Sequence, residues 1–272
     1  MTPASLVRGT DIETLPIDRV VTRRRGYTVV RSPGNPVHWW GNLLLFDEPP
    51  VDGDGERWEA LFERELPGLV HRTFAWDSDG VVGRAREEFL PRGYELDESV
   101  GLTAAPADVR QHPRANADVV VRALEVDGDE ELWREVIELQ TAARDEGFDE
   151  EEYREFATAR LDSRRELFRA GRGAWYVALD PESGTVAASC GIVVTAGRGR
   201  YQVVDTADTY RRRGIASRLL VDVAADAARA YGAKQLVIVA DAAYHAVGLY
   251  ESLGFERTER AFGVCRPKMT KP

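Results

Sequence analysis

The segment YRRRGIASRLL, residues 210–220, stands between a β-branched run at Tyr201–Val204 and an amphipathic helical pattern. The first turn of a helix has unpaired N–H groups and the positive end of the helix dipole. Gly214 and Ala216 have too little side chain to keep an anion away from those N–H groups, and three arginines add positive charge. The segment therefore predicts a diphosphate-binding loop at the start of a helix.

The residues on both sides of this loop predict a mixed α/β sheet. We expect a strand within 119–126, helices over 130–144 and 150–170, strands over 175–179, 186–195 and 201–204, a helix from 215 to Gly232, a strand over 236–239, a helix over 244–253 and a last strand over 260–266. The third of three antiparallel strands forms a crossover with the helix after Gly214 and the strand over 236–239. The sheet should therefore begin antiparallel and contain one parallel pair at the crossover.

A second motif, A-x-x-L-Y-x-x-x-G-F at 246–255, places Tyr250 39 residues after Arg211. Together with R-x-x-G-x-A at 211–216 and the order of the expected elements, this motif resembles the GCN5-related N-acetyltransferase (GNAT) family. The resemblance covers roughly residues 118–268. It implies a GNAT fold with a mixed sheet that is splayed at its centre.

The resemblance also implies acetyl-CoA as co-substrate and a set of residues that bind it. The diphosphate loop corresponds to Arg211, Arg212, Arg213, Gly214, Ile215, Ala216 and Ser217, and the pantetheine arm pairs with Val204, Asp205 and Thr206. Tyr250 stands where the family has a tyrosine that protonates the leaving thiolate. The reference pKa of a thiol is about 8.5 and that of tyrosine about 10, so a positioned phenol is a reasonable general acid.

Two positions depart from the family pattern. Ala243 replaces an asparagine that is common seven residues before the tyrosine, and the third meander strand has no glutamate. Asp205 is the nearest acid, either as the base or as a cap of the phosphate turn. Asp145 or Glu146 and water alone are the other candidates for the base. Nothing near Cys190 in the sequence would lower its pKa, so we expect direct transfer without an acyl-enzyme.

The N-terminal part has a similar order of elements, which suggests a partial internal repeat. We expect strands at 27–30, 42–46, 70–76 and 100–103 and helices at 58–66 and 82–90; FLPRGYE at 89–95 parallels YESLGFE at 250–256. Carboxylates in DEPPVDGDGE, residues 47–56, would repel a diphosphate at the corresponding loop. Residues 1–112 are thus predicted to form a degenerate GNAT-like domain that binds no cofactor, with an unrelated α+β domain as the alternative.

The Pro-containing connection at 104–118 separates this part from a GNAT domain over 118–272. A pseudo-domain of this kind could cover the acceptor cleft. We therefore expect Trp39, Trp40 and Trp76 to pack toward that cleft or the domain interface.

Composition excludes several other classes of protein. The chain has 272 residues, 36 Lys and Arg against 46 Asp and Glu, a net charge of −10, two cysteines and four scattered histidines. These features argue against nucleic-acid binding, a metal site and a disulfide framework. No apolar run approaches the roughly 18 residues of a membrane-spanning helix, and we expect a cytoplasmic monomer or homodimer. The negative charge mildly favours a cationic acceptor.

The sequence predicts an acyl-CoA-dependent N-acyltransferase that acts on a small amine of unknown identity. The alternative is a non-catalytic module that binds CoA or a partner protein.

Overall fold

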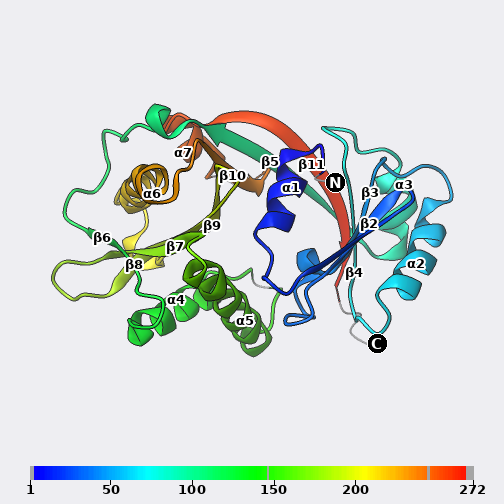
Figure 1. Cartoon of the computed structure of the whole chain (residues 1–272), viewed down its shortest axis with the longest axis horizontal. Helices are drawn as coiled ribbons and strands as arrows, with labels where there is room; N and C mark the ends of the chain where they lie inside the picture. The colour runs from blue at the N-terminus through cyan, green and yellow to red at the C-terminus, as the bar shows by residue number, and fades with distance from the viewer. Residues whose placement is uncertain (1–2, 146, 244–245, 268–272) are drawn as a thin grey trace. The chain divides into compact units, whose positions relative to one another are not determined.

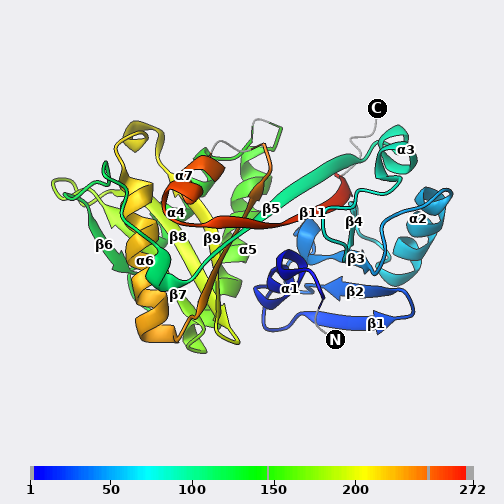
Figure 2. The ribbon, with the colours of Figure 1, turned by 90° about the horizontal axis from the view of Figure 1, so that it is seen from above.

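The computed structural model describes residues 3–145, 147–243 and 246–267 (Figures 1 and 2). The chain divides into two compact units. The first comprises Met1–Gly101, Val239–Tyr244 and Thr258–Pro272, and the second comprises Leu102–Ile238 and His245–Arg257. Neither unit is a continuous half of the chain. The N-terminal segment of the first unit ends at Gly101, before the predicted connection, and two later segments belong to the same unit.

The second unit contains the predicted meander and crossover. Its strands are β6 (Val120–Ala123), β7 (Gly173–Leu179), β8 (Val186–Thr195), β9 (Arg198–Thr206) and β10 (Gln235–Asp241), and its helices are α4 (Glu130–Ala142), α5 (Glu150–Arg169), α6 (Ile215–Tyr231) and α7 (Val247–Ser252). The strands lie in the order β6-β7-β8-β9-β10, antiparallel except for the parallel pair of β9 and β10. Helices α4 and α5 cover one face of this sheet, and α6 covers the other (Figure 1).

Alternating side chains of β7 supply the cores on both faces. Trp175 and Val177 pack with α4 and α5 in one buried cluster. On the face covered by α6, the Tyr176 hydroxyl bonds to the Asp226 carboxylate. The Tyr201 hydroxyl on β9 likewise donates to the Leu220 carbonyl at 2.7 Å. The period-2 alternation of a strand buried on both faces thus fixes α4 and α5 opposite α6.

The first unit repeats part of this order, with one helix before its antiparallel strands and no counterpart of β6. It contains α1 (Leu6–Glu13), β1 (Val20–Arg24), β2 (Tyr27–Arg31), β3 (Leu43–Phe46), α2 (Asp54–Glu65), β4 (Arg72–Trp76), α3 (Ala85–Phe89), β5 (Glu95–Ala104) and β11 (Glu256–Arg266). Short 3-10 helices lie at Trp39–Gly41, Leu90–Arg92, Pro106–Asp108 and Asp208–Tyr210. Strands β1, β2 and β3 are antiparallel, α2 connects the parallel pair β3 and β4, and β11 pairs antiparallel with β4.

The repeat extends to single residues. Helix α2 begins after Gly53, with φ +83°, and α6 begins after Gly214, with φ +75°. Gly93 and Gly254 also have positive φ, +81° and +101°, and each precedes a buried aromatic residue. The first unit therefore has the predicted GNAT-like arrangement of strand, crossover helix, strand and glycine-terminated turn.

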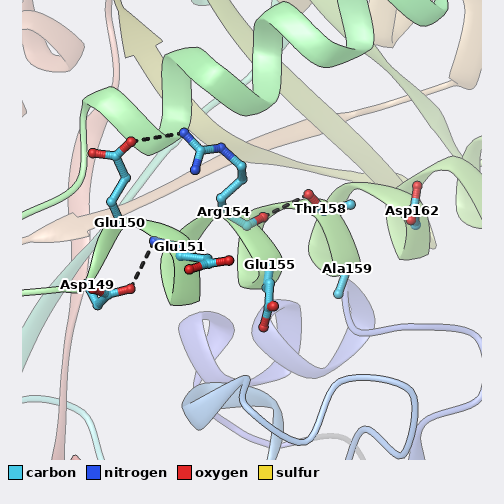
Figure 3. Close-up of a pocket in the computed structure, with 8 residues that line it drawn as sticks. All are labelled: Asp149, Glu150, Glu151, Arg154, Glu155, Thr158, Ala159 and Asp162. Carbon is cyan, nitrogen blue, oxygen red and sulfur yellow. Dashed lines mark hydrogen bonds and ion pairs between the residues drawn. The ribbon is translucent and has the colours of Figure 1, made fainter.

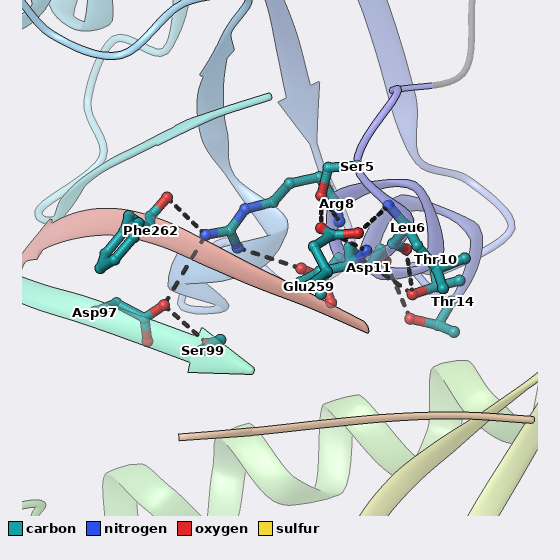
Figure 4. Close-up of polar contacts among 11 residues, drawn as sticks. Ser5, Leu6, Arg8, Thr10, Asp11, Thr14, Asp97, Ser99, Glu259 and Phe262 are labelled. Atoms are coloured by element: carbon teal, nitrogen blue, oxygen red, sulfur yellow. Dashed lines mark hydrogen bonds and ion pairs between the residues drawn. The ribbon is translucent and has the colours of Figure 1, made fainter. Parts of the chain in front are cut away.

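Two elements of the first unit, α1 and β1, have no counterpart in the sequence prediction. Helix α1 is held by contacts that are distant in the sequence: the Glu259 carboxylate accepts from the Ser5 hydroxyl and from the N–H groups of Leu6, at 2.7 Å, and Val7, at 3.2 Å (Figure 4). The buried Arg8 side chain donates to the Phe262 carbonyl at 2.7 Å.

Among the described residues, no helix combines the length and apolar character needed to cross a membrane.

Candidate functional site

The predicted diphosphate loop is a tight turn that leads into α6. A Cβ on Gly214 would lie 1.8 Å from the Arg114 carbonyl oxygen, so only glycine fits at this position. The Asn116 N–H donates to the Gly214 carbonyl at 3.1 Å, and its side-chain amide donates to the Arg213 carbonyl at 3.3 Å. The connection around residues 114–116 therefore holds the loop in place.

The N–H groups at the start of α6 are open. No residue in the described part of the chain accepts a hydrogen bond from the backbone N–H of Ile215, Ala216 or Ser217, and the first turn carries no acidic side chain. Arg212 is exposed with φ +63°, and the Arg213 guanidinium lies 5.3 Å from the Tyr210 ring centroid. Open N–H groups, the helix dipole and nearby arginines are features that suit an anion, as the sequence predicts for this turn.

The corresponding turn of the first unit is occupied by the protein itself. The Glu88 carboxylate accepts from the N–H groups of Gly53, at 2.9 Å, and Gly55, at 3.0 Å. These hydrogen bonds lower the pKa of Glu88. The Asp54 carboxylate also accepts from the Val51 N–H at 2.9 Å. The first unit thus places a carboxylate where the second unit leaves the helix N-terminus open.

Strand β9 has an irregularity just before the predicted pantetheine-binding residues. Ser189 of β8 pairs with Asp205, but Gly191 pairs with Gln202, so β9 has one extra residue between these pairs. Val203 within this bulge has φ +34°. Strand β10 pairs with β9 at only three positions, the last being Val237 with Arg200. The splay predicted for the parallel strands is therefore present, and Val204–Thr206 lie beyond the last pair.

Asp205 follows the bulge and is half-buried. Burial raises the pKa of its carboxyl to about 6, while the charges of Arg160 and Arg211 act in the opposite direction. Among the described residues, none in the phosphate loop donates a hydrogen bond to Asp205, so the structure does not assign it the alternative role of capping that turn. A carboxyl with this pKa is ionised near neutral pH and remains a usable base.

Tyr250 is buried on α7, with 5% of its surface exposed. The turn after it is tight, because a Cβ on Gly254 would lie 2.5 Å from the Asp108 carbonyl oxygen. Phe255 donates its N–H to the Tyr250 carbonyl at 3.2 Å and packs edge-on against Tyr201 of β9, with 6.0 Å between ring centroids. Phe255 of this turn thus packs against β9, the strand that carries Asp205.

Other residues singled out in the sequence fall elsewhere. Cys190 is fully buried, and burial raises the pKa of its thiol, which makes it a poor nucleophile. Glu146 lies outside the described residues. The expectation for Trp76 is wrong: this side chain belongs to the buried core of the first unit and donates to the Val81 carbonyl at 2.6 Å. Trp40 is contacted by Arg8 of the same unit, with 5.3 Å from the guanidinium to the ring centroid.

Sequence reasoning missed two features near this site. The first is the hydrogen bond from the Asn116 side chain to the loop, between residues about a hundred positions apart. The second is the electrostatic interaction of Arg160 on α5 with Asp205 on β9. Neither pairing leaves a spacing signal in the sequence. The polar Asn116 within the Pro-containing connection was the only local hint of the first feature.

Comparison with known proteins adds a family and a fold. Residues 133–255 match the model of the acetyltransferase (GNAT) family. No curated protein matches the sequence.

Several solved structures are similar over nearly the whole chain. A functionally unknown conserved protein from Staphylococcus epidermidis is 13% identical, with a TM-score of 0.70 over 95% of this chain and 98% of that one. A GCN5-related N-acetyltransferase from Kribbella flavida is 15% identical, with a TM-score of 0.61 over 95% of this chain and 92% of that one. A tandem GNAT protein from the clavulanic acid biosynthesis pathway is 15% identical, with a TM-score of 0.57 over 100% of this chain and 92% of that one. Residues 133–255 are therefore a domain of the acetyltransferase (GNAT) family, within a chain that has the fold of GNAT proteins, a tandem member among them.

Proposed function

We propose that this protein is an acyl-CoA-dependent N-acyltransferase that transfers an acetyl group from acetyl-CoA to the amine of a small acceptor. The observation that carries the proposal is the contrast between the two crossover helices. The helix N-terminus after Gly53 is filled by the Glu88 carboxylate, whereas the one after Gly214 has open N–H groups and arginines around it. The second helix is thus suited to an external diphosphate.

The remaining site residues suit direct transfer. The pantetheine arm pairs with Val204–Thr206, where β9 has separated from β10. The acceptor nitrogen attacks the thioester carbonyl, Asp205 takes the proton from that nitrogen, and the C–S bond breaks. Tyr250 then donates its proton to the departing thiolate. The acetyl group moves to nitrogen in one covalent exchange, and Cys190 takes no part because its thiol is buried.

A second candidate function is a CoA-binding or protein-interaction module without turnover. It is favoured by Ala243, where family members commonly have asparagine, and by the lack of a glutamate on β9. Both candidates require the open loop. They differ in whether an amine is acetylated.

Both candidate functions require binding of acetyl-CoA, and calorimetric titration with acetyl-CoA tests that binding. Arg212→Glu should raise the Kd about tenfold or more, because it places a negative charge beside the diphosphate. Arg229→Glu, an exposed change in the last turn of the same helix, is the matched control and should leave the Kd unchanged. Failure of the wild-type protein to bind at millimolar acetyl-CoA would refute the proposal.

Turnover separates the two candidates. Release of free thiol from acetyl-CoA is followed across a panel of amines, with mass spectrometry of the acetylated product. Amine-dependent thiol release supports the enzyme. Binding without release for any amine supports the non-catalytic module.

A further inference from the structure

One arginine of α5 differs from others on the same helix. Arg154 pairs with Glu150 at 3.0 Å (Figure 3) and with Glu138 at 3.0 Å. Arg169 pairs with Asp127 at 2.6 Å. Arg160 lies between them on the helix. Within the described residues, no carboxylate comes within ion-pair distance of its guanidinium.

The guanidinium of Arg160 is nevertheless held in one orientation. One terminal nitrogen donates to the Gln140 amide oxygen of α4 at 2.6 Å, and the guanidinium carbon lies 4.7 Å from the Phe156 ring centroid. The residue is half-buried, and its Nε is fully buried without an acceptor among the described residues. A fixed, partly desolvated cation without a direct ion-pair partner is costly, and an anion bound to it lowers that cost.

Gln140 gives a second, independent indication. Its side chain is completely buried, at 0% exposure, and its amide nitrogen has no hydrogen-bond acceptor in the part of the chain that the structure describes. A buried donor that is left unsatisfied in this way destabilises the folded protein. Two neighbouring side chains on α4 and α5 thus both carry a donor that the protein does not satisfy.

This pair lies close to the proposed base. The charge of Arg160 is the main effect that opposes the burial of Asp205, so the guanidinium and the carboxyl are near each other without forming an ion pair. The anion that Arg160 lacks would therefore be bound beside the group that takes the proton from the acceptor amine. That anion is suited to be part of the acceptor itself.

We propose that the acceptor is an amino acid, in the broad sense of one molecule with an amine and a carboxylate, and that Arg160 binds the carboxylate. Gln140 is a positioning residue that orients the guanidinium. The inference rests on the proposed function and narrows its substrate. Amines without a carboxylate, such as polyamines, are then poor acceptors, and the net charge of −10 does not select the substrate.

The test uses a homologous series of acceptors on the full chain. Linear ω-amino acids from glycine to 6-aminohexanoate are each compared with their own primary amide, which keeps length and amine but removes the charge. The measured quantity is the ratio of kcat/KM for acid over amide. At the best chain length the ratio should be about tenfold or more, because a charge-assisted hydrogen bond is lost in the amide.

Three variants assign the preference to this pair. Arg160→Gln should bring the ratio close to one without changing the KM for acetyl-CoA. Gln140→Glu, which is nearly isosteric and supplies Arg160 with an internal carboxylate, should have the same effect while the arginine is kept. Arg169→Gln removes an arginine that already has a partner and should leave the ratio unchanged.

The outcomes separate this inference from the proposed function. A wild-type ratio near one with measurable transfer overturns the inference and leaves the acyltransferase standing. Equal loss for acid and amide in Arg160→Gln overturns it as well, since that result indicates a structural role alone. If no amine is acetylated, binding of N-acetylglycine against N-acetylglycinamide in the presence of CoA decides: a preference for the acid that Arg160→Gln abolishes supports the site, and no preference overturns it.

Discussion

Tyr250 combines burial with a position at the end of a short helix, and its proposed role depends on its hydroxyl alone. Tyr250→Phe keeps the buried ring and removes the acid. We expect kcat to fall about a hundredfold with little change in the KM for acetyl-CoA, because general acid catalysis contributes about 10²–10⁴. Steady-state kinetics with thiol detection measures this, with Tyr153→Phe on α5 as the control. An unchanged kcat would show that Tyr250 is only a core residue.

Asp205 makes a prediction about pH. Burial raises its pKa to about 6, so the base form, and with it kcat/KM, should increase as pH rises through 6. Asp205→Asn should remove that rise and lower kcat/KM about a hundredfold. A pH–rate profile between pH 5 and 8 measures both, and a rise that persists in the asparagine variant would assign it to another group.

The same shift also predicts a change in stability. A raised carboxyl pKa means that the folded state holds the proton more tightly than the unfolded state, so this group lowers stability as pH rises from about 4 to about 6. The melting temperature of Asp205→Asn minus that of the wild type should therefore be larger at pH 7 than at pH 4. Thermal unfolding at the two pH values measures this readout independently of activity.

At the scale of elements, α2 and α6 are corresponding crossover helices of the two units. They differ in what lies at the helix N-terminus. Both begin after a glycine with positive φ, but α2 has Asp54 and Glu56 in its first turn and receives the Glu88 carboxylate of α3. In the described part of the chain, helix α6 has no acidic residue in its first turn and no carboxylate that accepts from its first N–H groups. A carboxylate at a helix N-terminus stabilises the fold and blocks an external anion. The proposed function therefore assigns a structural role to α2 and anion binding to α6.

This interpretation predicts that Glu88→Gln destabilises the protein by about 1 kcal/mol at pH 7, the usual effect of losing an N-terminal cap. The N–H groups of Gly53 and Gly55 lower the pKa of Glu88. Its contribution is therefore present above the unfolded pKa and disappears as pH falls through the lower folded value, so the variant and wild type should converge in acid. Urea unfolding at several pH values measures this.

The neighbouring Glu87 provides the matched control. It is exposed and forms a surface ion pair with Arg84 at 3.3 Å, so Glu87→Gln should change stability by less than about 0.5 kcal/mol. An equal loss in both variants would mean that the glutamine at position 88 acts through general surface charge rather than through the helix N-terminus.

At the scale of the whole molecule, the two units are not independent lengths of chain. Residues 258–272 follow the GNAT domain in sequence but belong to the first unit, where β11 pairs with β4 through Gly263–Ala75 and Val264–Phe74. Ala261–Cys265 are buried there. A fragment that begins at the predicted domain boundary therefore contains β11 but lacks β4, the strand with which β11 pairs.

A fragment of residues 118–272 should for this reason be largely insoluble, because the apolar side of β11 and its unpaired edge become exposed. Any soluble fraction should bind acetyl-CoA more weakly than the full chain, since the fragment lacks Arg114 and Asn116, which hold the phosphate loop. Sedimentation and calorimetry measure the two effects. A monomeric fragment that unfolds cooperatively and binds with full affinity would contradict this account.

The sequence by itself determined the elements from Glu130 to Tyr231 and the turn at Gly214, because helical and strand periods and a required glycine act locally. The similarity of the two halves was also visible in the spacing of their Gly-aromatic turns. The site residues carried over by resemblance, such as Tyr250 and Asp205, stay predictions until their variants are measured.

Only the tertiary structure decided which groups complete these local patterns. Glu88 reaches a glycine 35 positions earlier, Glu259 caps a helix more than 250 positions earlier, and Gln140 orients Arg160 across two helices. Periodicity specifies which face of an element is buried, but it carries no information on which distant carboxylate or amide meets a given N–H group. For that physical reason the loop was predictable from sequence, whereas the contrast between a filled and an open helix N-terminus was not.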